Sequence, residues 1–154
     1  MTITATLNAM DLPRIMLHCL AEHAKKYDCH KPFVLDGYVY CTNGQILARM
    51  EYPCVPDTPG NWPPVDRYRE QINTDAARWR EAGWLLDRAV PVGESQRLAV
   101  PVGDQYMNPY YASLLMWHDA LIDDRPGIMG PIAWCALAWD GTEIRGVVMP
   151  CNPL

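Results

Sequence analysis

Two hairpin signals are the strongest structural features of this sequence. The segment 33–52 has strand-like residues on both sides of an Asn-Gly pair at 43–44, and the segment 132–149 is arranged in the same way around an Asp-Gly pair at 140–141. Asx-Gly pairs supply the positive φ angles that a two-residue hairpin turn requires. A proline follows each return strand. The sequence therefore predicts two antiparallel hairpins, one near each end of the chain.

Helical patterns lie between and beside these hairpins. Each begins at an Asp, Thr or Asn that is a preferred N-cap residue, and two of the three have a proline in the first turn. Helices are predicted over 11–26, 74–86 and 108–122. Shorter strands are expected at 1–7, 89–92 and 97–102, where apolar and β-branched residues stand between turn residues.

The order of these elements predicts one domain, 1–154, built from two half-repeats. Residues 1–53 and 97–154 each carry a strand, a helix and a hairpin, and the Pro- and Trp-rich segment 54–96 is inserted between them. We expect an α+β fold in which the strands join into sheet and both helices lie on one sheet face.

Composition narrows the function classes. Thirteen Lys and Arg against 18 Asp and Glu give a net charge of −5, which argues against a surface coated with phosphate-binding cations. No apolar run approaches the ~20 residues of a membrane helix, and the N-terminus lacks the basic segment of a signal peptide. The six cysteines form no C-x-x-C pair, which favours buried free thiols and a reducing cytoplasm.

Sequence motifs for catalysis are missing. There is no G-x-S-x-G, no phosphate-binding loop and no dinucleotide-binding glycine motif, and no pair of carboxylates shares a helix face with a His or Lys. We expect no catalytic residues, no metal and no cofactor. Enzyme function stays as an alternative that would need a pocket or a bound metal joining His18, His23 and Cys29.

Three side chains on the first predicted helix are candidates for DNA contact. Arg14, His18 and Lys25 fall in one narrow stripe at ~100° per residue. Three such groups would supply a modest, salt-sensitive affinity for phosphates. The alternative is a solvated helix face.

Four further residues are candidates for binding a protein partner. Trp62, Trp79 and Trp84 lie in the inserted segment, and aromatic anchors are common in binding hot spots. Arg49 follows the Asn-Gly turn of the first hairpin. The alternative is structural: the tryptophans anchor the insertion by packing, and Arg49 pairs with Asp36 or Glu51.

Several segments resemble the bacterial DNA polymerase sliding clamp, the β subunit. Residues 39–49 (VYCTNGQILAR) are similar to its ATDGHRLA hairpin, and 144–150 (IRGVVMP) are similar to its last strand, which ends in VVMP. Residues 61–67 (NWPPVDR) resemble its FPDYRR segment, and 98–102 (LAVPV) resemble a strand that precedes a clamp helix. Together these four pieces contain 30 of the 154 residues and are distributed between positions 39 and 150.

The resemblance implies one sliding-clamp-like domain, of the kind carried singly by phages and mobile elements. It implies a non-enzymatic protein of the host-cell cytoplasm that acts in DNA replication or host takeover. It would bind DNA, weakly, or a protein partner, either a host replisome protein or further copies of itself, because a six-domain ring would need six copies. The alternative is a phage inhibitor or counter-defence protein that uses the fold as a scaffold, which fits the −5 charge and the acidic Asp119 and Asp123.

Overall fold

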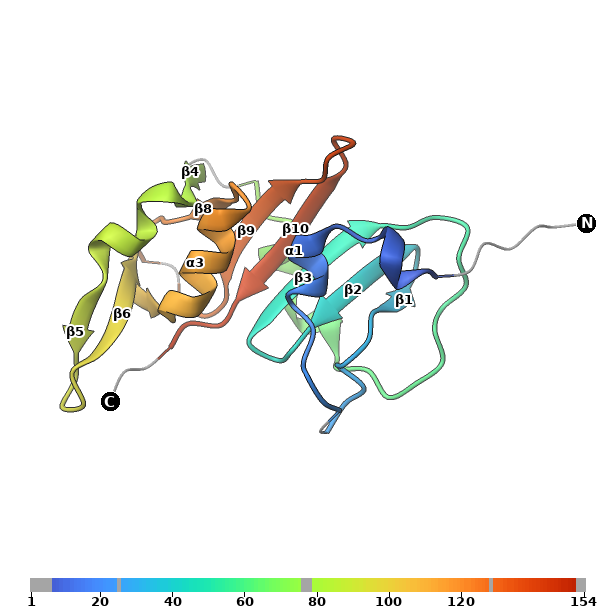
Figure 1. The fold of residues 1–154 in the computed structure, drawn as a ribbon, viewed down its shortest axis with the longest axis horizontal. Coiled ribbons are helices and arrows are strands. Elements are labelled where there is room, and N and C mark those ends of the chain that lie inside the picture. The colour runs from blue at the N-terminus through green and yellow to red at the C-terminus, as the bar shows by residue number, and fades with distance from the viewer. Residues whose placement is uncertain (1–6, 25, 76–78, 128, 152–154) are drawn as a thin grey trace, which may run out of the picture.

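The computed structural model describes residues 7–24, 26–75, 79–127 and 129–151, and this part of the chain is mostly β-structure (Figure 1). Its strands form two antiparallel sheets, one with the order β1-β2-β3-β10-β9-β8-β4 and one with the order β5-β6-β7. The strands are β1 (Phe33–Leu35), β2 (Tyr38–Thr42), β3 (Ile46–Glu51), β4 (Trp79–Glu81), β5 (Val90–Val92), β6 (Arg97–Val102), β7 (Gln105–Met107), β8 (Leu121–Asp123), β9 (Ile132–Leu137) and β10 (Glu143–Val148).

Both predicted hairpins are confirmed, although their turns are longer than two residues, because the last paired residues are Thr42 with Leu47 and Leu137 with Glu143. β2 pairs with β3 across Asn43-Gly44, where Gly44 has a φ of 91° and the Asn43 side chain accepts hydrogen bonds from the backbone N–H groups of Gln45 and Ile46. β9 pairs with β10 across the turn that contains Gly141, which has a φ of 85°. The predicted strand pair at 89–92 and 97–102 is confirmed as β5 and β6.

The two halves of the large sheet meet where β3 pairs with β10, in a ladder from Ile144 opposite Met50 to Val148 opposite Ile46. Gly146 lies in this ladder, between β3 and β9. A Cβ atom at Gly146 would lie 2.5 Å from Cζ2 of the fully buried Trp134 and closer still to the backbone oxygen of Leu47. Glycine is therefore required at the centre of the sheet because no side chain fits between its two neighbours.

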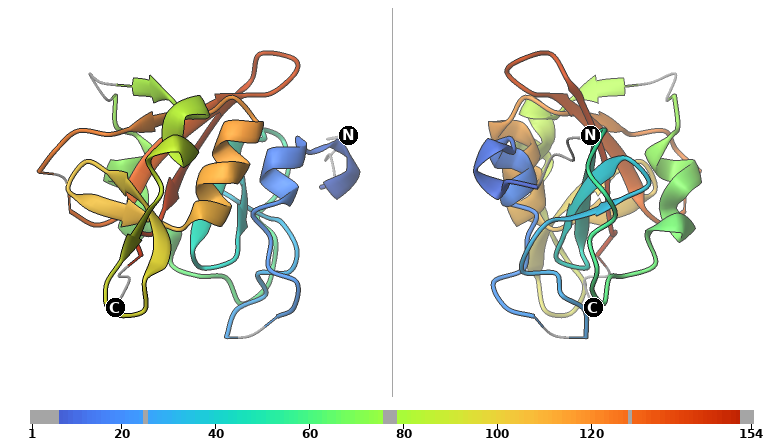
Figure 2. Two further views of the ribbon diagram at one scale, coloured as in Figure 1. Left: turned by 60° about the vertical axis from the view of Figure 1, so that its left-hand side comes forward. Right: turned by 90° about the vertical axis from the view of Figure 1, so that its right-hand side faces the viewer.

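Short helices cover the large sheet on both faces (Figure 2). On one face α1 and α3 lie beside each other over the larger apolar core, and on the other face η2 and α2 cover a smaller core that contains Phe33, Leu47 and Val147. The helices are η1 (Ala9–Asp11), α1 (Arg14–Leu17), η2 (Val65–Tyr68), α2 (Arg69–Ile72), η3 (Ala82–Arg88) and α3 (Pro109–Trp117).

The prediction of an α+β fold with two helix-bearing half-repeats is wrong. The strands dominate, and the helix predicted over 11–26 is a single turn, α1. After Leu17 the N–H groups of Cys19 and Leu20 donate to carbonyls three residues back, and the N–H of Ala21 donates to the carbonyl of Cys29, so the α-helical ladder is not continued. The half-repeats therefore lack the matched pair of long helices on which the sliding-clamp-like arrangement rests.

Pairing between distant strands also overrides the other helix predictions. Within the predicted helix 74–86, β4 pairs with β8, and η3 follows with Gly83, a poor helix former, in its interior. The predicted helix 108–122 does begin at Asn108, but α3 ends at Trp117 because Asp119 adopts a φ of 52° and β8 joins the sheet. The strand predicted at 1–7 lies outside the described residues except for Leu7, which packs against the larger core.

Burial of the cysteines follows the prediction only in part. Cys19, Cys29 and Cys41 are buried free thiols, Cys135 and Cys151 are half-buried, and Cys54 is exposed. Burial raises the pKa of Cys41 to about 12. Among the described residues, no helix has both the length and the apolar character needed to cross a membrane.

Candidate functional site

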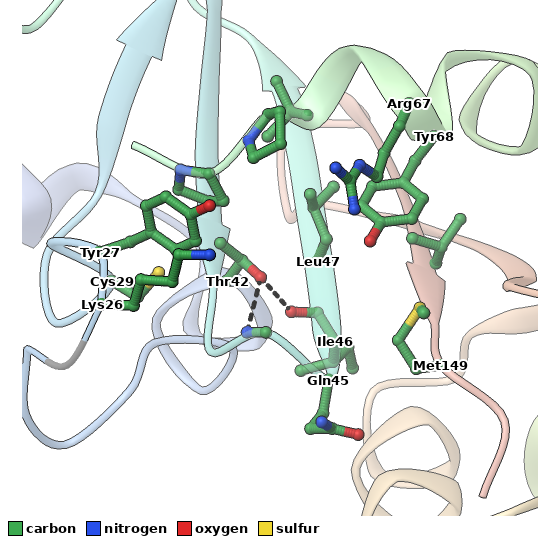
Figure 3. A pocket seen from close by; sticks show the side chains of 15 residues that line it. Lys26, Tyr27, Cys29, Thr42, Gln45, Ile46, Leu47, Arg67, Tyr68 and Met149 are labelled. Carbon is green, nitrogen blue, oxygen red and sulfur yellow. Dashed lines mark hydrogen bonds between the residues drawn. The ribbon is translucent and has the colours of Figure 1, made fainter. Parts of the chain in front are cut away.

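A cavity of about 280 Å³ opens where three segments of the chain meet (Figure 3). The β2–β3 turn, the segment 63–68 and the end of β10 line it, together with Tyr27 and Cys29 from the loop before β1. We call it the hairpin groove and define its floor by Thr42, Leu47, Val65, Val147 and Met149. Of these, only Met149 is not buried. The floor is apolar apart from the Thr42 hydroxyl.

Hydrogen bonds hold the turn side of the groove in place. The Thr42 hydroxyl donates to the carbonyl of Ile46 at 2.8 Å and accepts from the N–H of Gly44 at 3.1 Å (Figure 3). The N–H of Met149 donates to the carbonyl of Gln45 at 2.7 Å. The end of β10 is therefore tied to the β2–β3 turn, and the two segments form one wall.

Stacked aromatic rings support the opposite wall. Trp62 lies 4.5 Å from Phe33, centroid to centroid, and is nearly parallel to it, while its indole N–H donates to the carbonyl of Thr58 at 2.7 Å. This fixes the chain directly before Pro63 and Pro64, which line the groove. The rigid proline backbone then leads into the buried Val65.

Two cationic side chains, Lys26 and Arg67, line the rim of the groove, and both are exposed (Figure 3). The Cys29 thiol also lines it. Burial raises the pKa of Cys29, and the neighbouring Asp28 raises it further. The thiol stays protonated near neutral pH and behaves as part of the apolar wall. The site combines an apolar floor, rigid walls and a positive rim, an arrangement suited to binding.

The structure bears on only part of the DNA-facing stripe predicted on the first helix. Arg14 and His18 are both exposed and lie one turn apart, because the N–H of the C-cap His18 donates to the carbonyl of Arg14, but α1 ends at Leu17 and no helix continues towards residue 25. Lys25 lies outside the described residues. The stripe was predicted from a helical period that the chain does not keep beyond the first turn of α1.

The three candidate tryptophans are half-buried, and Trp62 and Trp84 pack against the apolar cores. Trp62 anchors the groove wall, as described above. Trp79 lies in β4 with the Arg145 guanidinium 5.7 Å from its ring centre, and Trp84 lies in η3 with the Arg88 guanidinium 4.0 Å away. Trp79 and Trp84 do not line the hairpin groove.

Arg49 also has a structural environment. Its guanidinium lies 4.2 Å from the centre of the Tyr38 ring, and one of its N–H groups donates to the Asn73 side chain at 2.6 Å. The expected ion pair with Asp36 or Glu51 is not found among the described residues. Arg49 lies on the same sheet face as α2 but outside the hairpin groove.

Sequence reasoning did not identify Arg67, Met149 or Lys26 as site residues. The sequence did contain a feature that could have indicated two of them, because Arg67 and Met149 lie in segments whose sequences resemble the sliding clamp. Their proximity depends on the pairing of β3 with β10, which joins residues about a hundred positions apart and is not visible in a local pattern. Within the described residues, no three or more His, Cys, Asp or Glu side chains are grouped to hold a metal ion.

Acidification is expected to destabilise the protein through His118, the C-cap of α3. Burial, the nearby His18 and Arg14 lower its pKa below 6.5, against the opposing effect of Asp119. The unfolded state therefore binds the proton more tightly, so His118 costs no stability well above pH 6.5 and its cost grows as the pH falls through 6.5 towards the lowered folded value. Urea unfolding at pH 7.5 and 5.0 measures this. His118→Gln should reduce the pH dependence, and an unchanged difference between the two pH values would contradict this role of His118.

Comparison with known protein families, with curated protein sequences and with solved structures finds no match for this chain.

Proposed function

We propose that this chain is a non-enzymatic binding protein whose hairpin groove takes a short, extended, apolar segment of a protein partner. The groove carries the proposal, because it is a recess above a largely apolar floor and its walls are already held by hydrogen bonds and ring stacking. Its volume of about 280 Å³ is below the ~300–1,000 Å³ of pockets that enclose a small molecule. It fits one or two side chains of a peptide.

The charges at the rim indicate what flanks those side chains. Lys26 and Arg67 are exposed cations at the groove of a chain with a net charge of −5. This locally positive charge favours a partner with Asp or Glu next to its apolar residues, because complementary charges increase the association rate and disfavour competing partners.

The sequence resemblance supports a partner in DNA replication. The groove is lined by residues from 39–49, 61–67 and 144–150, which are three of the segments that resemble the sliding clamp. A replisome protein of the host cytoplasm is the partner class that fits both this resemblance and the free cysteines.

Selection of peptides against the purified protein tests the proposal. A phage-displayed library of random short peptides should yield sequences with two or more apolar residues beside Asp or Glu. Synthetic copies of the selected peptides, labelled with a fluorophore, should bind in an anisotropy titration. Met149→Glu and Arg67→Glu should each weaken binding by at least about tenfold, because one places a charge on the apolar floor and the other reverses the rim charge.

Matched variants separate groove binding from general surface effects. Met129→Glu and Arg97→Glu make the same changes at exposed positions outside the groove and should leave binding unchanged. The proposal fails if no peptide family is enriched, or if the selected peptides bind Met149→Glu as tightly as the unmodified protein while circular dichroism shows both to be folded.

A further inference from the structure

On the face of the large sheet opposite the smaller core, α1 and α3 lie beside each other (Figure 2). The C-caps of these helices, His18 and His118, meet edge-to-face with ring centres 5.6 Å apart, and the exposed Tyr110 and Trp117 of α3 complete an aromatic surface. We call it the helix patch and define it by His18, Tyr110, Leu114, Trp117 and His118.

The helix patch carries both a projection and a recess. Trp117 is 80% exposed and Tyr110 is 63% exposed, although both lie on a helix whose other side is buried in the core. Beside them is a shallow cavity of about 210 Å³ lined by all five residues of the patch and Ser113. This volume lies below the ~300–1,000 Å³ of small-molecule pockets, and it suits a single bulky side chain.

Charges of both signs border the helix patch. Arg14 in α1 and Asp119 after α3 are exposed, and both lie close enough to His118 to influence its pKa. Neither forms an ion pair within the described residues. A single surface thus presents a projecting indole, a recess, a cation and an anion.

We propose that two copies of this chain associate through the helix patch in a two-fold contact. In such a contact the same surface serves both subunits, so it must contain each feature and its complement. The helix patch meets this condition: Trp117 of one copy would enter the recess of the other, and Arg14 and Asp119 offer opposite charges to each other across the axis. A nucleic acid is a less suitable partner for this surface, because its phosphates would meet the carboxylates of Asp11 and Asp119. Arg14 is the one permanent cation among the described residues of η1, α1 and α3.

The area of the helix patch indicates a reversible dimer. Two aromatic side chains per copy, each of ~150–250 Å², supply at most about 600–1,000 Å² over both copies, which is below the about 1,200 Å² of stable specific interfaces. Weak association, in the micromolar range, is therefore expected, and each copy should stay folded as a monomer. The hairpin groove opens beside the smaller core, so both grooves stay accessible in such a dimer.

Sedimentation equilibrium of the full chain from about 1 to about 500 µM brackets this affinity range. The unmodified protein should pass from monomer to dimer. Trp117→Ala should weaken association by at least about tenfold. Trp139→Ala is the matched control, because Trp139 is 93% exposed at the β9–β10 turn, and it should leave association unchanged.

A charge variant tests the two-fold contact independently of Trp117. Arg14→Glu leaves each patch with acidic borders only, so association should weaken and should recover in part as salt is raised. Circular dichroism of each variant checks that the fold is kept, which is expected because both side chains are exposed. A monomer at every concentration, or a dimer that neither Trp117→Ala nor Arg14→Glu weakens, would overturn the proposal.

Discussion

Replacing Gly146 by alanine is expected to destabilise the protein by more than about 4 kcal/mol, a loss that only a few mechanisms can produce. The added methyl group would collide with the backbone oxygen of Leu47 and with the ring of Trp134. Leu47 belongs to β3 and Trp134 to β9, so the collision cannot be relieved by one flexible side chain. A domain of ordinary stability, ~5–15 kcal/mol, would lose much of its folded population.

Urea unfolding followed by far-ultraviolet circular dichroism measures this loss. Gly83→Ala provides the matched control, because a Cβ atom at Gly83 meets nothing within 4 Å and its backbone is not in the left-handed region. That variant should be neutral or slightly more stable. Equal midpoints for Gly146→Ala and Gly83→Ala would show that β3 and β9 can separate to admit a side chain, which contradicts the packing described here.

Phe33→Ala is expected to cost about 3–5 kcal/mol, the usual range for removing a buried phenylalanine. Phe33 is fully buried in the smaller core, where its ring stacks on Tyr40 with centroids 5.4 Å apart and on Trp62 at 4.5 Å. The change leaves a cavity under Trp62. Because Trp62 anchors the chain before Pro63, the groove wall should loosen as well.

Two measurements separate these effects. Thermal or urea unfolding reports the loss of stability, and peptide anisotropy under conditions where the variant is fully folded reports the groove. Leu98→Ala, at an exposed position on β6, should change stability by less than about 0.5 kcal/mol. A Phe33→Ala protein of unchanged stability would show that the stacked rings contribute little to the smaller core.

The parts of the fold that were predicted correctly are set by local turn chemistry. In each turn the glycine, Gly44 or Gly141, adopts a positive φ, and the preceding Asn43 or Asp140 side chain accepts hydrogen bonds from the following backbone, which needs no distant partner. Asn108 caps α3 for the same local reason, since its side chain accepts from the N–H of Tyr110.

The parts that were predicted wrongly depend on distant partners. Trp79 lies in a segment with a helical pattern, yet it pairs with Asp123 some forty residues later, and strand pairing determines its conformation. Ala21 leaves the helical ladder for the carbonyl of Cys29, a contact that its own neighbours do not signal. The hairpin groove was missed for the same reason. The segments that contain Arg67 and Met149 can be recognised in the sequence, but their proximity in the fold cannot.

The position of β10 has a consequence for the synthesis of this protein. β10 is the last strand of the described chain, yet it lies in the middle of the large sheet between β3 and β9. While the ribosome is still translating the preceding residues, β3 and β9 have no common partner, and each presents an unpaired edge of the kind that promotes aggregation. The N-terminal hairpin can form early, but the sheet closes only when the nascent chain has released residues 143–148. Until β10 pairs with both neighbours, the edge of β3 stays open, so the stage before sheet closure is the one at which aggregation is most favoured.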